Sequence, residues 1–119
     1  MEKILITGAS GFVGSHLVEE ALGRGLEVFA GVRKSSSRKY LQNARIRFLE
    51  MDFADKKNLK EKLKKEKFDY IIHNAGVVSA SRPQHYYTVN YEYVKNLIDV
   101  LSAEDITPRK FVQMSSLAS

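Results

Sequence analysis

A glycine-rich turn near the N-terminus constrains the fold of this chain more than any other sequence feature. Gly8, Gly11 and Gly14 lie three residues apart, directly after the apolar run at residues 4–6. This spacing predicts a strand, a sharp turn, and a helix whose first N–H groups point into the turn. One glycine permits the turn, one lets the backbone approach a ligand, and one lets the helix pack closely on the strand. Because free N–H groups and the helix dipole both favour an anion, we expect a pyrophosphate cradle here.

The residues that follow the turn support this interpretation. Gly23 and Gly25 end the predicted helix, and a second apolar run at residues 28–30 comes at the distance that a βαβ unit requires. The alternative is a strand–helix turn that binds nothing. The predicted helix has an apolar face made of Phe12, Val13, Leu17, Val18, Ala21 and Leu22.

Short apolar runs alternate with amphipathic segments along the whole chain. We expect strands near residues 3–7, 27–32, 46–50, 69–73 and 110–114, and helices near 12–23, 56–66 and 84–102. Residues 36–43 are a poorly defined helix or loop. The alternation predicts a doubly wound parallel α/β sheet (the Rossmann arrangement) with strand order 3-2-1-4-5. Its ligand crevice should lie at the carboxyl ends of the strands.

Composition excludes several classes of protein. The chain has no cysteine, which rules out disulfides and thiolate metal ligands. His16, His73 and His85 lack metal-ligand spacing, so we expect satisfied polar residues and no metal. No apolar run approaches transmembrane length, and no signal peptide is recognisable. We expect a cytoplasmic protein without a membrane partner.

The net charge of +5 comes largely from a lysine-rich segment at residues 56–67. Acidic residues interrupt it and no aromatic residues are interleaved, which favours a solvated helix face over a nucleic-acid or acidic-partner patch. Leu59, Leu63 and Phe68 would form the seam that faces the core. We therefore expect no nucleic-acid partner.

Residues 7–14, with the sequence Thr-Gly-Ala-Ser-Gly-Phe-Val-Gly, resemble the cofactor motif of the extended short-chain dehydrogenase/reductase family. That family includes NAD-dependent epimerases and dehydratases that act on nucleotide sugars. The chain also resembles the family at residues 49–55, 73–76, 88–90 and 114–116, so the resemblance covers essentially all of it. It implies that the first of these segments holds the adenine and that the second lies near the nicotinamide ribose.

The expected cofactor-binding residues combine the glycine turn with the ends of later strands. Asp52 can accept a hydrogen bond from an exocyclic amine such as that of adenine, or it can cap the helix that follows. Asn74, Ala75 and Gly76 would let a ligand ring lie close to the backbone, or they form an ordinary loop. Asn90 is expected to tie backbone groups together near a helix start. The full set is Gly8, Ser10, Gly11, Phe12, Val13, Gly14, Arg33, Lys34, Asp52, Phe53, Asn74, Ala75, Gly76 and Asn90.

Cofactor choice depends on the end of the second predicted strand. A carboxylate there would bind the ribose 2′-hydroxyl of NAD, whereas a cation would accept the 2′-phosphate of NADP. Residues 31–35 contain Arg33 and Lys34 but no acid, and a guanidinium fork suits phosphate. NADP is therefore the expected cofactor, with NAD as the alternative. Arg33 is otherwise a solvated loop residue, or stacks on the adenine of either cofactor.

The resemblance implies that a Ser, a Tyr and a Lys act together in catalysis. It assigns the serine to Ser116, beside Ser115, and places a Tyr-x-x-x-Lys motif on a helix beyond residue 119. Tyr91 and Lys95 have this spacing but precede the fifth strand, so we expect them to be non-catalytic and Tyr93 to lie in the core.

Residues 1–119 are expected to form an incomplete dinucleotide-binding domain, because no closing helix follows the fifth predicted strand. The resemblance implies an NAD(P)-dependent epimerase, dehydratase or reductase that acts on a nucleotide-diphosphate sugar by hydride transfer at the nicotinamide. Without the Tyr and Lys, this fragment should be inactive. The alternative is a non-catalytic NAD(P)-binding sensor. Family members often dimerise, so a homodimer of the full-length protein is also expected.

Overall fold

Five parallel strands form one sheet in the order β3-β2-β1-β4-β5, which confirms the predicted doubly wound arrangement. The computed structural model describes residues 1–34, 36–74 and 83–114, with the backbone alone for residues 83–90. The strands are β1 (Lys3–Thr7), β2 (Glu27–Val32), β3 (Arg47–Glu50), β4 (Tyr70–His73) and β5 (Lys110–Gln113). The helices are α1 (Phe12–Gly23), α2 (Lys56–Lys65) and α3 (Pro83–Ala103).

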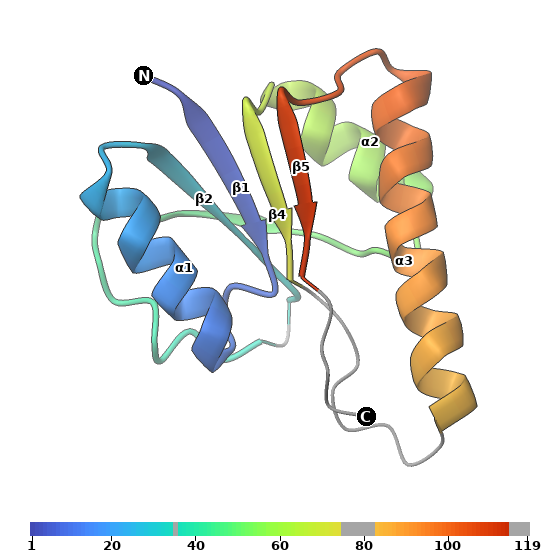
Figure 1. The fold of residues 1–119 in the computed structure, drawn as a ribbon, viewed down its shortest axis with the longest axis horizontal. Helices are drawn as coiled ribbons and strands as arrows, with labels where there is room; N and C mark the ends of the chain where they lie inside the picture. The colour runs from blue at the N-terminus through green and yellow to red at the C-terminus, as the bar shows by residue number, and fades with distance from the viewer. Residues whose placement is uncertain (35, 75–82, 115–119) are drawn as a thin grey trace.

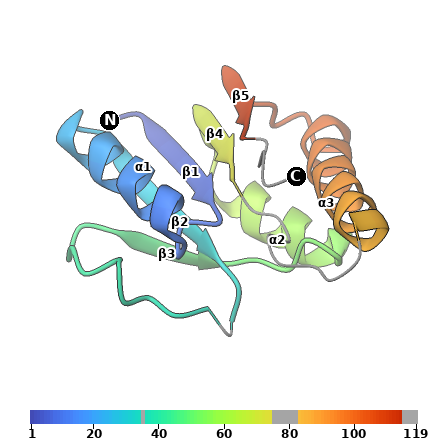
Figure 2. The same cartoon turned by 60° about the horizontal axis from the view of Figure 1, so that its bottom comes forward.

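The helices cover both faces of the sheet (Figures 1 and 2). α1 packs over one face, whereas α2 and α3 pack over the other. Ile4 and Ile6 of the central strand β1 belong to the core under α1, and Leu5 belongs to the core under α2 and α3. Burial on both faces explains why the sequence of β1 is a continuous apolar run rather than an alternation.

The first turn of α1 departs from the predicted apolar face. Phe12 and Val13 are 66% and 52% exposed, whereas Val18, Ala21 and Leu22 are buried. The first turn lies at the end of the sheet, beside the glycine turn (Figure 1), and so these two side chains do not reach the core. Including Phe12 and Val13 in the apolar face was wrong.

The two edge strands are more exposed than the buried strands that the apolar runs predict. Arg47 and Glu50 of β3 and Lys110 and Gln113 of β5 are exposed, because among the described residues each of these strands pairs with a single neighbour. Residues 36–43, for which the sequence pattern is ambiguous, contain turns: the Leu41 N–H donates to the Arg38 carbonyl at 3.0 Å.

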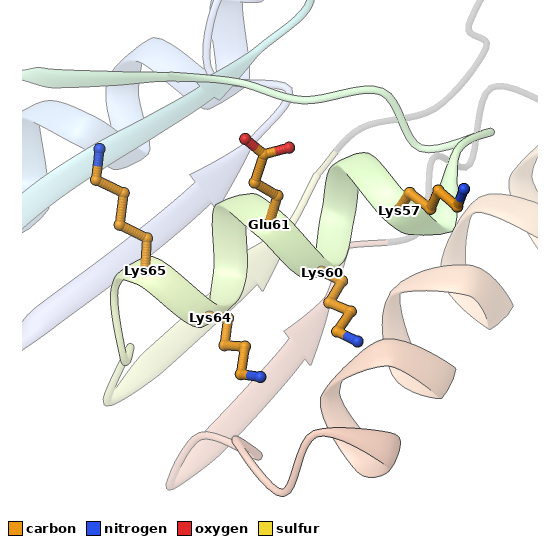
Figure 3. A pocket seen from close by; sticks show the side chains of 5 residues that line it. All are labelled: Lys57, Lys60, Glu61, Lys64 and Lys65. Atoms are coloured by element: carbon orange, nitrogen blue, oxygen red, sulfur yellow. The ribbon is translucent and has the colours of Figure 1, made fainter.

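α2 buries the predicted seam and exposes its lysines. Leu59 and Leu63 are buried, as is Phe68 beyond the helix end. Lys60 and Lys64 form ion pairs with Glu104, just after α3, at 3.5 and 3.3 Å. A hollow on the outer face of the helix (Figure 3) includes none of the expected cofactor-binding residues; it is lined by Lys57, Lys60, Glu61, Lys64 and Lys65.

Membrane-spanning helices and metal sites are both absent from the described ranges. There, no helix is both long enough and apolar enough to cross a membrane. Nor does any group of three or more His, Cys, Asp or Glu side chains gather there with the geometry of a metal site.

Candidate functional site

The turn between β1 and α1 has the geometry of an anion cradle. Gly8 has a φ of 63°, a left-handed conformation that favours glycine, and its carbonyl accepts the Gly11 N–H at 3.3 Å. A Cβ at Gly14 would overlap the Gly8 carbonyl oxygen and would lie 2.7 Å from Ala9 Cα. Gly8 therefore makes the tight turn, and Gly14 lets α1 pack against it.

The N-cap residue of α1 has no side chain that could cap the first N–H groups of the helix. Gly11 is the N-cap, and the first turn contains no acidic residue. The first N–H groups of a helix have no partner within the helix. Phe12, Val13 and Gly14 thus present backbone donors at the positive end of the helix dipole, beside the half-buried Ser10. These groups fit the oxygens of a pyrophosphate.

A buried hydrogen-bond chain joins the ends of β1 and β4. Thr7 and His73 pair in register, and Thr7 Oγ1 lies 2.8 Å from His73 Nδ1. Thr7 Oγ1 also accepts the Asn74 N–H at 2.9 Å. The Asn74 side chain donates from Nδ2 to the Gly8 carbonyl at 3.5 Å. The structure therefore brings Asn74 to the glycine turn.

His73 is held neutral by its surroundings. Burial lowers the pKa of His73 from 6.5 to about 4. Its Nδ1 bonds to Thr7, whereas its buried Nε2 has no hydrogen-bond partner in the part of the chain that the structure describes. The expectation of a satisfied histidine is confirmed at Nδ1 and wrong at Nε2. The ring instead packs on Phe53 and Phe111, with centroid distances of 5.3 and 6.4 Å.

The segment between β3 and α2 is shaped by two aspartates. Asp55 is the N-cap of α2 and accepts the N–H groups of Lys57 and Asn58 at 3.0 and 3.4 Å. The alternative that Asp52 caps this helix is therefore wrong. Asp52 Oδ1 accepts the Ala54 N–H at 3.0 Å, and this side chain is exposed at the carboxyl end of the sheet.

Phe53 is anchored from α3. Its ring is buried and lies 5.7 Å from the ring of Tyr93, at an interplanar angle of 30°. Its carbonyl accepts a hydrogen bond from Asn96 Nδ2 at 2.8 Å. Because the side chain of Phe53 lies in the core, a ligand at this turn would meet its main chain.

Arg33 follows β2 directly and is exposed. Its guanidinium carbon lies 5.5 Å from the centroid of the Tyr93 ring, and the backbone N–H of Arg33 donates to Ser36 Oγ at 3.2 Å. Lys34, the next residue, is also exposed. Tyr93 is half-buried, so the expectation that it belongs to the core is only partly confirmed.

The described site residues thus gather at the carboxyl ends of β1, β2, β3 and β4. Ala75, Gly76, Ser115 and Ser116 lie outside the described residues, and for Asn90 only the backbone in α3 is described. Tyr91 is 67% exposed, and Lys95 pairs with Asp99 at 3.0 Å, so both point away from the core as expected.

Sequence reasoning missed the links between the ends of different strands. Thr7 and His73 are 66 positions apart, and their contact follows from the register of β1 and β4. The sequence offers one signal for this contact: Thr7 and His73 are polar residues that each end an apolar run. Tyr93 and Asn96 carried a weaker one: they lie three residues apart and thus on one face of α3.

The NAD-dependent epimerase/dehydratase family model matches residues 4–119 of the chain. UDP-glucose 4-epimerase of Mus musculus is 31% identical over an alignment 123 residues long, which covers 89% of this chain and 35% of that protein. The solved structure of Thermus thermophilus UDP-glucose 4-epimerase in complex with NAD matches 87% of this chain and 35% of its own, with 28% identity and a TM-score of 0.74. L-threonine dehydrogenase of Clostridium difficile matches 98% of this chain and 37% of its own, with 32% identity and a TM-score of 0.78. The chain therefore spans about a third of the length of these relatives.

Proposed function

The chain belongs to the NAD-dependent epimerase/dehydratase family, and we propose that it is the dinucleotide-binding part of an epimerase, dehydratase or reductase. The observation that carries this proposal is the start of α1, where glycine stands in place of a capping side chain and no acid competes for the N–H groups. Hydride acceptance and return are the chemistry that a nicotinamide cofactor supplies when bound. The residues of this chain bind and orient the cofactor.

Each part of the site has a role in this proposal. The N–H groups of Phe12, Val13 and Gly14 hold the pyrophosphate, beside Gly8, Ser10 and Gly11. Asp52 and the main chain of Phe53 flank the adenine. Residues 74–76 lie toward the nicotinamide ribose, and Asn90 keeps a structural role.

NADP is the proposed cofactor, with NAD as the alternative. Support comes from Arg33 and Lys34, two exposed cations directly after β2, in a segment without an acid. A guanidinium can form two parallel hydrogen bonds to a phosphate, which a ribose hydroxyl cannot match. The Thermus thermophilus relative was solved with NAD, so the preference of this chain depends on its own residues at this position.

The proposed substrate of the whole protein is a nucleotide-diphosphate sugar. The names of the UDP-glucose 4-epimerases among the relatives support this class. Ser116 would polarise the reacting oxygen, with a Tyr and a Lys from outside residues 1–119 as proton-transfer partners. We propose that residues 1–119 alone have no turnover, because Tyr91 and Lys95, which have the Tyr-x-x-x-Lys spacing, precede β5.

A homodimer of the full-length protein is also proposed. Tyr91 and Ile98 lie on the exposed face of α3 and are 67% and 45% exposed. Exposed apolar surface on one helix face is the kind of surface that a second subunit covers when it is continuous.

Calorimetric titration of the chain with NADP and with NAD tests the proposal. Both cofactors should bind, NADP more tightly than NAD. Arg33→Ala should lower the affinity for NADP and change the affinity for NAD little. Arg33→Lys, which keeps the positive charge but lacks the guanidinium fork, is the control for charge alone. Equal losses for both cofactors with Arg33→Ala would contradict the 2′-phosphate assignment, and no binding of either cofactor would contradict the proposed function. Epimerase or dehydrogenase turnover by residues 1–119 would contradict the assignment of the missing groups.

A further inference from the structure

Arg33 does not project freely into solvent. Its guanidinium carbon lies 5.5 Å from the centroid of the Tyr93 ring, within the range of a cation–π contact. The two residues come from different elements: Arg33 directly follows β2, and Tyr93 is in α3. The contact restricts a side chain that otherwise has many rotamers.

Tyr93 is itself fixed in place. Its ring packs on the buried ring of Phe53 at 5.7 Å, and Phe53 packs in turn on His73. One turn along α3, Asn96 donates to the Phe53 carbonyl at 2.8 Å. The Tyr93 ring therefore contacts both the buried ring of Phe53, which supports it, and the Arg33 guanidinium.

We propose that Tyr93 is a positioning residue that sets the preference for a 2′-phosphate, because it holds the Arg33 guanidinium at the end of β2. The inference rests on the proposed function and extends it to a residue of α3, 60 positions away in sequence. An arginine that is already ordered loses less entropy when it binds an anion, and so it binds the anion more tightly. NAD lacks that phosphate, so the affinity for NAD should not depend on the contact between Arg33 and Tyr93.

The test is calorimetry with two matched ligand pairs, NADP against NAD and adenosine 2′,5′-bisphosphate against adenosine 5′-monophosphate. The variants are Tyr93→Leu, Tyr93→Phe and Tyr93→Trp, with Tyr91→Leu as the control on the exposed side of α3. Loss of the ring should weaken each 2′-phosphorylated ligand by about two- to five-fold, the effect of a cation–π contact at an exposed site. The affinities for NAD and adenosine 5′-monophosphate, which lack the 2′-phosphate, should not change. The Tyr91→Leu variant should bind all four ligands as the wild type does.

The aromatic variants keep the test decisive if Tyr93→Leu fails to fold. Cation–π attraction is strongest for Trp, so the ratio of affinities should rise in Tyr93→Trp and be retained in Tyr93→Phe, whereas a residue without this role would leave the ratio unchanged in both. The inference would be overturned if the wild type prefers NADP and a folded Tyr93→Leu protein keeps the same ratio of NADP affinity to NAD affinity. That result would leave the proposed function intact. Equal weakening of both members of each pair would also overturn it, since Tyr93 would then act through Phe53. A wild type that binds no dinucleotide would mean that the proposed function itself fails.

Discussion

Thr7 and His73, the last residues of β1 and β4, pair in register and are joined by a 2.8 Å hydrogen bond between Oγ1 and Nδ1. Both side chains are buried. Through the same hydroxyl oxygen, Thr7 accepts the Asn74 N–H, and Asn74 reaches the carbonyl of Gly8. The glycine turn and the end of β4 are therefore one connected structure, located where the strand order reverses.

Replacing Thr7 with valine should test this connection. The change keeps the shape of the side chain but leaves the Asn74 N–H and His73 Nδ1 without the hydroxyl. Unmet buried polar groups cost about 1–3 kcal/mol, so the free energy of unfolding in urea should fall by that amount. Thr7→Ser, which restores the hydroxyl, should recover most of the loss. A valine variant as stable as wild type would show that the bond contributes nothing.

The stability of the chain should depend on pH through His73. The pKa of this side chain is about 4 in the folded chain, against 6.5 for an unburied histidine. Between these values the unfolded state binds more protons, so stability is full above pH 6.5 and falls as the pH is lowered toward 4. The slope should approach about 1.4 kcal/mol per pH unit. Urea titrations across this pH range measure it, and His73→Gln should remove this component; an unchanged slope in that variant would refute the assignment.

Two glycine-to-alanine changes on α1 should have opposite effects. A Cβ at Gly14 meets the backbone of Gly8 and Ala9, whereas a Cβ at Gly23 has no atom within 4 Å. Gly14→Ala should destabilise the chain by about 1–3 kcal/mol and abolish cofactor binding. Gly23→Ala should stabilise it by about 0.4–1 kcal/mol. Thermal unfolding and calorimetry on the pair measure both effects, and similar behaviour of the two variants would contradict the close-packing role of Gly14.

Substitutions of Asp52 and Asp55 should affect different properties: cofactor affinity for Asp52 and stability for Asp55. Asp55 caps α2 through the N–H groups of Lys57 and Asn58, so Asp55→Ala should cost about 1 kcal/mol of stability. Asp52 is exposed and makes a local turn bond, so Asp52→Ala should mainly lower the affinity for the adenine end of the cofactor. Unfolding curves and titration with adenosine 5′-monophosphate distinguish the two. A larger loss of affinity in Asp55→Ala than in Asp52→Ala would reverse the assignment.

The sequence was sufficient for the strands, the helices and their order because burial leaves a local pattern. Ile4, Leu5 and Ile6 read as a buried strand since both faces of β1 are covered. Periodicity cannot show where a helix meets the sheet, however, and so the predicted apolar face includes Phe12 and Val13, which are exposed.

The parts of the site that escaped prediction are contacts between distant residues. The Arg33–Tyr93 and Thr7–His73 contacts depend on strand order and register, which bring positions 60 or more residues apart together. The choice of Asp55 rather than Asp52 as the cap depends on where α2 begins, within a few residues. Such boundaries are the least certain part of any pattern in a single sequence.

Gly11 provides the most direct test of the central claim that the start of α1 binds a pyrophosphate. Its φ of −79° and ψ of 172° suit any residue, and a Cβ there would be 3.6 Å from the nearest atom, an ordinary contact. Gly11→Asp should therefore cap α1 and leave the chain at least as stable as wild type, while its carboxylate occupies and repels the anion site. Gly11→Asn, a neutral cap of the same shape, is the matched control and should lose less affinity.

The decisive measurement is the calorimetric affinity of Gly11→Asp for NADP, taken together with its urea unfolding curve. We predict that the fold is retained and that NADP and NAD binding are both lost. Wild-type affinity in a folded Gly11→Asp protein would contradict the account, because the dinucleotide would then have to bind elsewhere.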